Sequence, residues 1–214
     1  MTDTSSVQIL ELLASKICHD LISPIGAVSN GLEIMEELGA DSGDEVTDLI
    51  SFSASQANAK LRMLRMAYGL GGADSSIKHE EVHAIFEDYL KGEQRLSQDW
   101  DPHADLGISS CDGLPKIFMC CLILISEALP KGGVIQVESD NDNAMIISGK
   151  GENARFRDGY SEALNTTLPL NNLDPKLIHP YVTGLSARRY NFEITPNTQE
   201  NDFISLRIKS SNVF

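Results

Sequence analysis

Apolar residues recur at helical spacing through the first third of the chain. Between about Thr4 and Leu38 they lie three, four or seven positions apart, which predicts one long amphipathic helix. A break, GADSGDE, follows, and the periodicity then resumes as far as about Tyr68. Two long helices joined by a short turn near Asp41 predict an antiparallel hairpin. A single hairpin would leave part of its apolar surface exposed to solvent. We therefore expect two copies to pair as a four-helix bundle in a homodimer.

The pattern changes after the turn-rich segment GLGGADSS, residues 69–76. Segments EVHAIFEDYL and LPKIFMCCLILISEAL are predicted helices, and further helices are expected over residues 157–165 and 175–189. Alternating, β-branched segments predict four strands: GVIQVES, NAMIISG, YNFEIT and FISLRIKS. We therefore predict an α+β protein with a helical hairpin in residues 1–72. An α/β sandwich, a sheet with helices on one face, is expected in residues 73–214.

Composition and charge narrow the function classes. The chain has 214 residues, 42% of them hydrophobic, which suits a folded protein. A net charge of −14 without a dense Lys/Arg patch disfavours a nucleic-acid or membrane partner. The longest unbroken apolar run, residues 117–125, is too short to span a bilayer, and the N-terminus lacks a signal-peptide pattern. From the N-terminus we expect a cytoplasmic protein, and the four cysteines agree with this, since they make no C-x-x-C pair and no disulfide framework.

A stripe of polar and small residues accompanies His19 on the first predicted helix. Its members are Ser15, Lys16, Asp20, Ser23, Gly26, Ala27 and Asn30. Small residues let another protein approach closely, so the stripe suits docking better than core packing. Pro24 has no amide proton, so the carbonyl of Asp20 loses its partner and we expect a bend just after the histidine.

The segment HDLISP resembles the H-box of histidine kinases, His-(Glu/Asp)-x-x-x-Pro. It lies at the matching place, on the first helix of a dimerising hairpin. The resemblance implies that His19 is the phospho-acceptor and Asp20 its acid/base partner. Imidazole suits this work because it is a neutral nucleophile near pH 7.

The second half departs from the kinase pattern at its three nucleotide-binding boxes. LISEALPKGG has Glu127 where the kinase N-box has an Asn that holds Mg²⁺. SGKG has Ser148 where an Asp would read adenine, and HPYVTGLSARRY retains only GLS of the Gly-rich lid. The resemblance thus implies a fold similar to a kinase ATPase (Bergerat) domain. We expect this domain to bind no ATP, metal or other cofactor.

An H-box hairpin followed by a degenerate ATPase-like domain resembles the ChpT family of alphaproteobacterial histidine phosphotransferases. The resemblance implies a dimer that takes a phosphoryl group from the receiver domain of a hybrid kinase similar to CckA. It would pass this group to response regulators similar to CtrA and CpdR, in cell-cycle regulation. Mg²⁺ would be supplied by the partner receiver.

Positive charge near His19 suggests where an acidic receiver would dock. Arg62 and Arg65 lie about as far after the turn as His19 lies before it. With Lys16, and with Ser23 and Ala27 as close-approach positions, they are the predicted receiver-docking residues. The alternative is that both arginines simply solvate the outer face of the second helix.

Three other functions stay open from the sequence. One is an ATP-dependent sensor histidine kinase core. Another is a zinc metalloprotease built on HEEVH, residues 79–83, with Glu80 as base and Asp101 or His103 as a third ligand. That motif begins a predicted helix just after a linker. Acidic residues in the first turn of a helix are stabilised by the helix dipole, which is the simpler explanation of the motif. The last is a non-catalytic dimeric scaffold. A proline in the interior of a helix destabilises it by ~3 kcal/mol, and nothing in a plain scaffold would offset this loss.

Overall fold

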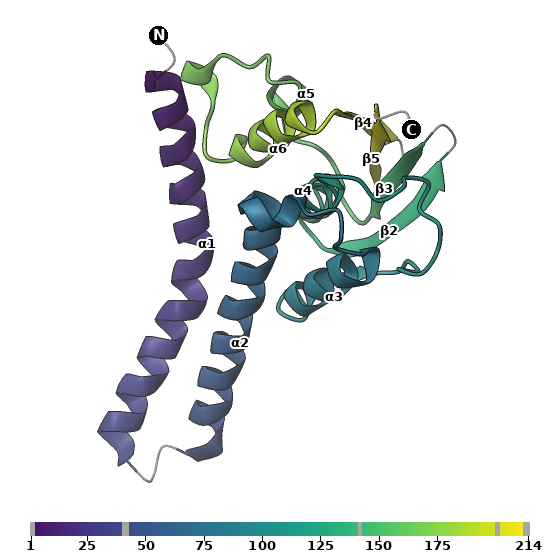
Figure 1. The fold of residues 1–214 in the computed structure, drawn as a ribbon. Helices are drawn as coiled ribbons and strands as arrows, with labels where there is room; N and C mark the ends of the chain where they lie inside the picture. Colours follow the sequence, from purple (N-terminus) through teal and green to yellow (C-terminus); the bar gives the residue numbers. More distant parts are fainter. Residues whose placement is uncertain (1–2, 40–42, 141–142, 200–201, 212–214) are drawn as a thin grey trace.

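The computed structural model of the protein describes residues 3–39, 43–140, 143–199 and 202–211. A long helical hairpin is joined to an α/β domain, which packs beside the end of the hairpin where the chain begins (Figure 1). The predicted architecture, a hairpin followed by an α/β sandwich, is confirmed. The turn expected near Asp41 falls outside the described residues.

The hairpin consists of α1 (Asp3–Leu38) and α2 (Gly43–Tyr68). α1 continues through Pro24 as one helix, so the proline does not end it. Gly31 fixes how the two helices meet, because a Cβ atom at this position would lie 2.5 Å from Cγ1 of Ile50. Residues equally far from the turn are therefore level with each other, as Lys16 and Leu64 are around one shared cavity.

The α/β domain adds helices and strands in mixed order. The helical elements are η2 (Leu70–Ala73), α3 (His79–Leu90), α4 (Leu114–Glu127), α5 (Tyr160–Leu164), η3 (Leu170–Asn172) and α6 (Ile178–Arg189). The strands are β1 (Leu96–Gln98), β2 (Gly133–Asp140), β3 (Ala144–Lys150), β4 (Phe192–Gln199) and β5 (Phe203–Ser210). Two helices are shorter than expected from the sequence. α5 covers only part of 157–165, and α6 begins at Ile178, after a turn in which the Asp174 carboxylate accepts hydrogen bonds from the amides of Lys176 and Leu177.

The five strands form one sheet in the order β1-β2-β3-β5-β4. β1 pairs in parallel with β2, and the other neighbours are antiparallel. The four strands predicted from alternation are all present, whereas β1 was not predicted. α4 packs against β2, β3 and β5, and α3 and α6 lie beside it on the same side of the sheet (Figure 1).

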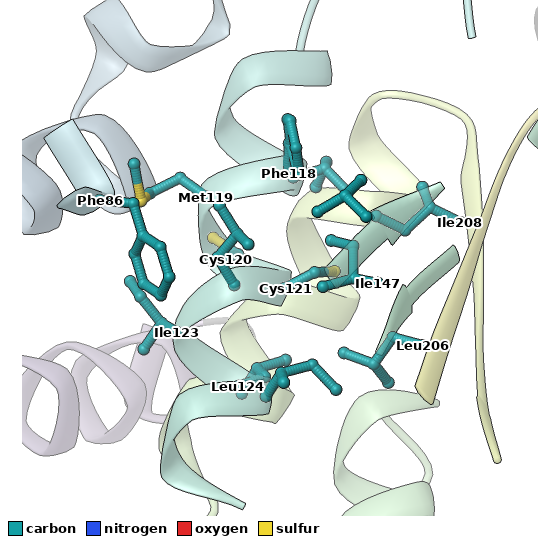
Figure 2. Close-up of a cluster of buried hydrophobic side chains, with 14 of the residues drawn as sticks. Phe86, Phe118, Met119, Cys120, Cys121, Ile123, Leu124, Ile147, Leu206 and Ile208 are labelled. Carbon is teal, nitrogen blue, oxygen red and sulfur yellow. The ribbon is translucent and has the colours of Figure 1, made fainter. Parts of the chain in front are cut away.

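α4 is the centre of the hydrophobic core. Nearly every residue of this helix is buried, and Ile117, Phe118 and Ile125 have no exposed surface. Figure 2 shows α4 between Phe86 of α3 on one side and Ile147, Leu206 and Ile208 of the sheet on the other. A helix apolar all round is expected where both of its sides are covered.

The core also reaches into the hairpin. Met63, Leu64, Met66 and Ala67, in the last turns of α2, belong to the same buried cluster as α4. α2 packs on α3 and α4, while α1 packs on α6. The α/β domain is therefore fixed to one end of the hairpin, and the turn end stands clear of it (Figure 1). The domain boundary at residues 72 and 73 stays a prediction.

Candidate functional site

His19 stands on the outside of α1. Its side chain is 83% exposed, and its Nδ1 lies 3.4 Å from Oδ1 of Asp20. The hydrogen-bond partner of one imidazole nitrogen determines which nitrogen carries the proton. A proton on Nδ1, facing Asp20, leaves the lone pair on Nε2. The ring is thus an accessible nucleophile with a carboxylate beside its other nitrogen.

Lys16 holds the Asp20 carboxylate from the previous turn of α1. Its Nζ lies 2.9 Å from Oδ1 and 2.7 Å from Oδ2 of Asp20. The same ammonium lies 3.4 Å from Oε1 of Glu127, the last residue of α4. Burial alone would lower the pKa of Lys16, but the two carboxylates outweigh it and the pKa is raised. Lys16 is therefore a charged link between α1 and the α/β domain.

Glu127 has a second partner in His179 of α6. Its Oε1 lies 3.1 Å from Nδ1 of His179. This separation is within ion-pair distance, but the geometry is not that of a hydrogen bond. Desolvation would raise the pKa of the Glu127 carboxyl, but His179 and Lys16 outweigh it and the pKa is lowered. Glu127 is therefore anionic at neutral pH.

These charged groups surround a small cavity between the hairpin and the α/β domain. Its volume is about 160 Å³. The lining residues are Lys16, Asp20, Lys60, Met63, Leu64, Tyr89, Glu93, Ile123, Glu127 and His179. Asp20 thus has two environments: one side approaches the His19 ring at the surface, and the other contacts the charged cluster in the cavity.

The predicted docking residues do not all gather around His19. Ser23 is exposed and Ala27 is half-buried on α1. Arg65 is exposed on α2, whereas the guanidinium of Arg62 donates a hydrogen bond of 2.8 Å to Asp88 of α3. The structure thus brings Lys16, His19 and Asp20 together and turns Arg62 towards α3.

The positions of the nucleotide boxes have other roles in this fold. Ser148 is buried in the middle of β3, between Gln136 of β2 and Ser205 of β5. The GLS segment lies inside α6, where a Cβ on Gly184 would lie 1.9 Å from the carbonyl oxygen of Leu164. This glycine allows α6 to pack closely on α5. Beside Glu127 lies an open hollow of about 530 Å³, lined by Arg155, Arg157 and Lys176 together with Asp158 and Asp174.

The histidines of the HEEVH segment face aromatic rings. The ring of His79 lies edge-on to that of Phe118, with 5.8 Å between the ring centroids, and the ring centroids of His83 and Trp100 are 4.7 Å apart. Glu80 contacts His103, with 3.2 Å between Oε1 and Nδ1. Among the described residues no three His, Cys, Asp or Glu side chains are grouped so that they could hold a metal ion. The zinc-protease alternative therefore has no geometric support in this part of the chain.

Comparison with known proteins identifies the class. The family model for the histidine phosphotransferase C-terminal domain matches residues 79–202, and the chain belongs to the histidine phosphotransferase family. The protein phosphotransferase ChpT of Brucella abortus (strain 2308) is 31% identical over 208 residues, covering 94% of this chain and 95% of the relative. The resemblance to the ChpT family that the sequence indicated is thereby confirmed.

One solved structure agrees with this assignment. The structure of a bacterial phosphotransferase superposes with a TM-score of 0.74 at 28% identity, covering 95% of this chain and 96% of that chain. The Acinetobacter baumannii histidine kinase AdeS gives a TM-score of 0.44 at 14% identity, covering 91% of this chain and 98% of that chain.

No helix in the described ranges is both long and apolar enough to cross a bilayer.

Two residues near the site were not assigned a role from the sequence. In the sequence, Glu127 stands out only as a departure from the kinase N-box, and no pattern marks His179. Contacts between α1, α4 and α6 bring both next to Lys16. A buried histidine leaves no periodic pattern, so only the fold reveals it.

Proposed function

We propose that this phosphotransferase relays a phosphoryl group between receiver domains through His19. The observation that carries the proposal is an imidazole, 83% exposed, with the Asp20 carboxylate 3.4 Å from its Nδ1. A receiver must reach the attacking nitrogen, and only an exposed ring allows this. Asp20 is the acid/base partner of His19.

The transfer step follows from the arrangement of these two side chains. The lone pair of Nε2 attacks the phosphorus of an aspartyl phosphate on the donor receiver. The new N–P bond forms as the P–O bond breaks, and the receiver carboxylate leaves with the bonding electrons. The ring becomes cationic, and the Asp20 carboxylate stabilises or accepts the Nδ1 proton. In the second half-reaction the carboxylate of an acceptor receiver attacks phosphorus, and the N–P electrons return to Nε2.

The proposed partners are the receiver of a hybrid histidine kinase and the receivers of response regulators. Membership of the same family as a ChpT protein supports this pairing. Regulators of the cell cycle, similar to CtrA and CpdR, are the proposed acceptors, and CckA-like kinases the proposed donors. Receivers carry their own carboxylates for Mg²⁺, so we assign no metal or other cofactor to this chain. Lys16, Ser23, Ala27, Arg62 and Arg65 remain the proposed docking residues.

We further propose that the protein uses no ATP. Two features support this part of the proposal. Glu127, at the N-box position, is already engaged by Lys16 and His179. Ser148 is only 5% exposed and has no carboxylate to offer an adenine amino group.

A homodimer through the hairpin is also proposed. Large apolar side chains that are exposed in the described residues gather on α1 and α2: Val7, Leu10, Ile22, Ile25, Leu32, Ile34, Leu38, Leu49, Phe52 and Leu61. Within the described residues, no other helix or strand lies beside the hairpin at the end where α1 finishes and α2 begins (Figure 1). A second hairpin would cover such a surface and complete a four-helix bundle.

The testing experiment offers the protein two phosphoryl donors separately. One is a receiver domain phosphorylated with a small acyl phosphate, and the other is radiolabelled Mg-ATP. We expect acid-labile, base-stable phosphate on His19 from the receiver and none from ATP. Labelling from ATP instead would identify an active histidine kinase. Labelling from neither, across a panel of receivers, would favour a non-catalytic scaffold.

A further inference from the structure

A continuous series of polar contacts connects the surface histidine to the α/β domain. It runs from His19 through Asp20 and Lys16 to Glu127, and ends at His179. The successive separations are 3.4 Å, 2.7 Å, 3.4 Å and 3.1 Å. Three helices, α1, α4 and α6, therefore contribute to the surroundings of one exposed imidazole.

Glu127 is one of the members of this series that the proposed chemistry does not use. It lies in the α/β domain and makes no contact with His19. Its effect on the site passes through Lys16, whose ammonium lies between two carboxylates. Lysine is flexible, and ordering a free lysine side chain costs conformational entropy. A second carboxylate offsets part of this cost by restricting the ammonium to one place.

Glu127 is itself held in place. His179 is 2% exposed, and its ring packs 5.4 Å from the ring of Tyr68. A buried ring with so little freedom gives the Glu127 carboxylate a fixed neighbour. The position of Lys16, and through it the Asp20 carboxylate, is thus determined by the core of the α/β domain.

We propose that Glu127 is a positioning residue for phosphotransfer: through Lys16 it fixes the Asp20 carboxylate in the orientation that faces Nδ1 of His19. This inference rests on the proposed function, because it requires His19 to be the phospho-acceptor. It gives the α/β domain a part in the transfer that involves no nucleotide. Residues that orient a reacting group commonly matter by 10-fold to 100-fold in rate, even without touching the substrate.

The test measures single-turnover transfer from a phosphorylated receiver, over a range of receiver concentrations. Glu127→Gln keeps the shape of the side chain and removes its charge. We expect the maximal rate to fall by about tenfold while the half-saturating receiver concentration stays unchanged. Lys16→Gln breaks the same contact from α1 and should lower the maximal rate without adding to the effect of Glu127→Gln.

Glu93→Gln is the matched control. Glu93 lines the same cavity but pairs with Lys60, with 3.5 Å between Oε1 and Nζ. This variant should transfer at the wild-type rate. An equal loss in Glu93→Gln would mean that the charge of the cavity, rather than the contact to Lys16, controls the rate, and would overturn the inference.

A double-mutant cycle with Asp20→Asn separates positioning from a general structural effect. If Glu127 acts through Asp20, Glu127→Gln should change the residual rate of Asp20→Asn less than twofold. A full tenfold loss in that background, or a wild-type rate in Glu127→Gln alone, would overturn the inference. Wild-type protein that accepts no phosphoryl group on His19 would instead refute the proposed function.

Discussion

Lys116, in the first turn of α4, donates a hydrogen bond of 2.6 Å from its ammonium to the carbonyl oxygen of Gly69, just beyond the end of α2. It donates another, of 3.0 Å, to the carbonyl oxygen of Ala67. The last carbonyls of a helix have no partner within the helix, so this lysine satisfies that of Ala67 from the core and also binds the carbonyl that follows the helix. Burial lowers the pKa of Lys116, and the nearby charge of Arg189 lowers it further.

Replacing this lysine should destabilise the junction between hairpin and domain. We expect Lys116→Met to lower the free energy of unfolding by about 1–3 kcal/mol, because the carbonyls of Ala67 and Gly69 lose their shortest hydrogen bonds and keep only the longer ones, of 3.4 Å, from Cys120 and Gly72. Urea denaturation measures this as a lower midpoint. Lys131→Met is the control, since Lys131 pairs at the surface with Glu152 and should change stability by less than ~0.5 kcal/mol. Equal losses in the two variants would refute a special role for Lys116.

Acid should weaken the fold through His79. Burial against Phe118 lowers the pKa of this histidine below 6.5, and the nearby Glu80 and Asp105 only partly oppose it. Between the folded-state pKa and 6.5 the unfolded chain binds the proton and the folded chain does not. Stability therefore falls as pH drops through 6.5.

His79→Gln removes this titration and should flatten the stability profile between pH 6.5 and 5, measured by urea denaturation at each pH. His103→Gln, at a ring that is 75% exposed, retains His79 and should keep the wild-type slope. An unchanged slope in His79→Gln would assign the acid sensitivity to another group.

The proposed dimer should depend on apolar residues near the turn. Leu32 of α1 and Leu49 of α2 are each about half exposed, and they lie equally far from the turn. We expect Leu32→Glu combined with Leu49→Glu to leave monomers of 23.4 kDa in sedimentation equilibrium, since burying two carboxylates is unfavourable. Leu70→Glu, at an 85% exposed position outside the hairpin helices, should still form the dimer.

Docking of a receiver should depend more on Arg65 than on Arg62. Both arginines are exposed, but Asp88 already offsets the charge of Arg62, whereas Arg65 forms no ion pair within the described residues. Arg65→Ala should lower the association rate several-fold at low salt, and less at high salt, because exposed charges are screened over ~8 Å at physiological ionic strength. Stopped-flow binding measures this. Lys150→Ala, at the end of β3, is the control and should associate at the wild-type rate.

His19 and Asp20 should differ in the severity of their loss. His19→Ala should abolish phosphotransfer with an almost unchanged melting temperature, because the side chain is 83% exposed. Asp20→Asn should slow transfer without abolishing it, since acid/base assistance contributes ~10²–10⁴-fold. Quench-flow labelling with a phosphorylated receiver measures both. Transfer by His19→Ala at the wild-type rate would place the acceptor elsewhere.

Much of the fold could be predicted from periodicity. The long helices and four of the strands carry hydrophobic patterns over six or more residues, and each was predicted. β1 has three residues and pairs only with β2, so no alternation could reveal it. α5 is a single short helix after Gly159, and sequence patterns do not define such short elements well.

The candidate site could be predicted only in its local part. His19 and Asp20 are neighbours in the chain, and Lys16 lies one turn earlier, so helical geometry alone groups them. The contacts of Lys16 with Glu127, and of Glu127 with His179, join elements that are far apart in the sequence. They depend on how α4 and α6 pack beside α1, which no local pattern encodes.

The exposure of His19 has a thermodynamic consequence for the proposed relay. A protein shifts an equilibrium only through interactions that differ between the two states. Solvent surrounds most of this ring, so few contacts distinguish the phosphorylated from the free imidazole. The transfer equilibrium is then set by the intrinsic free energies of the phosphohistidine and the aspartyl phosphates. Phosphate would run in whichever direction the supply of phosphorylated receivers dictates, and a cell can reverse the flow without altering this protein.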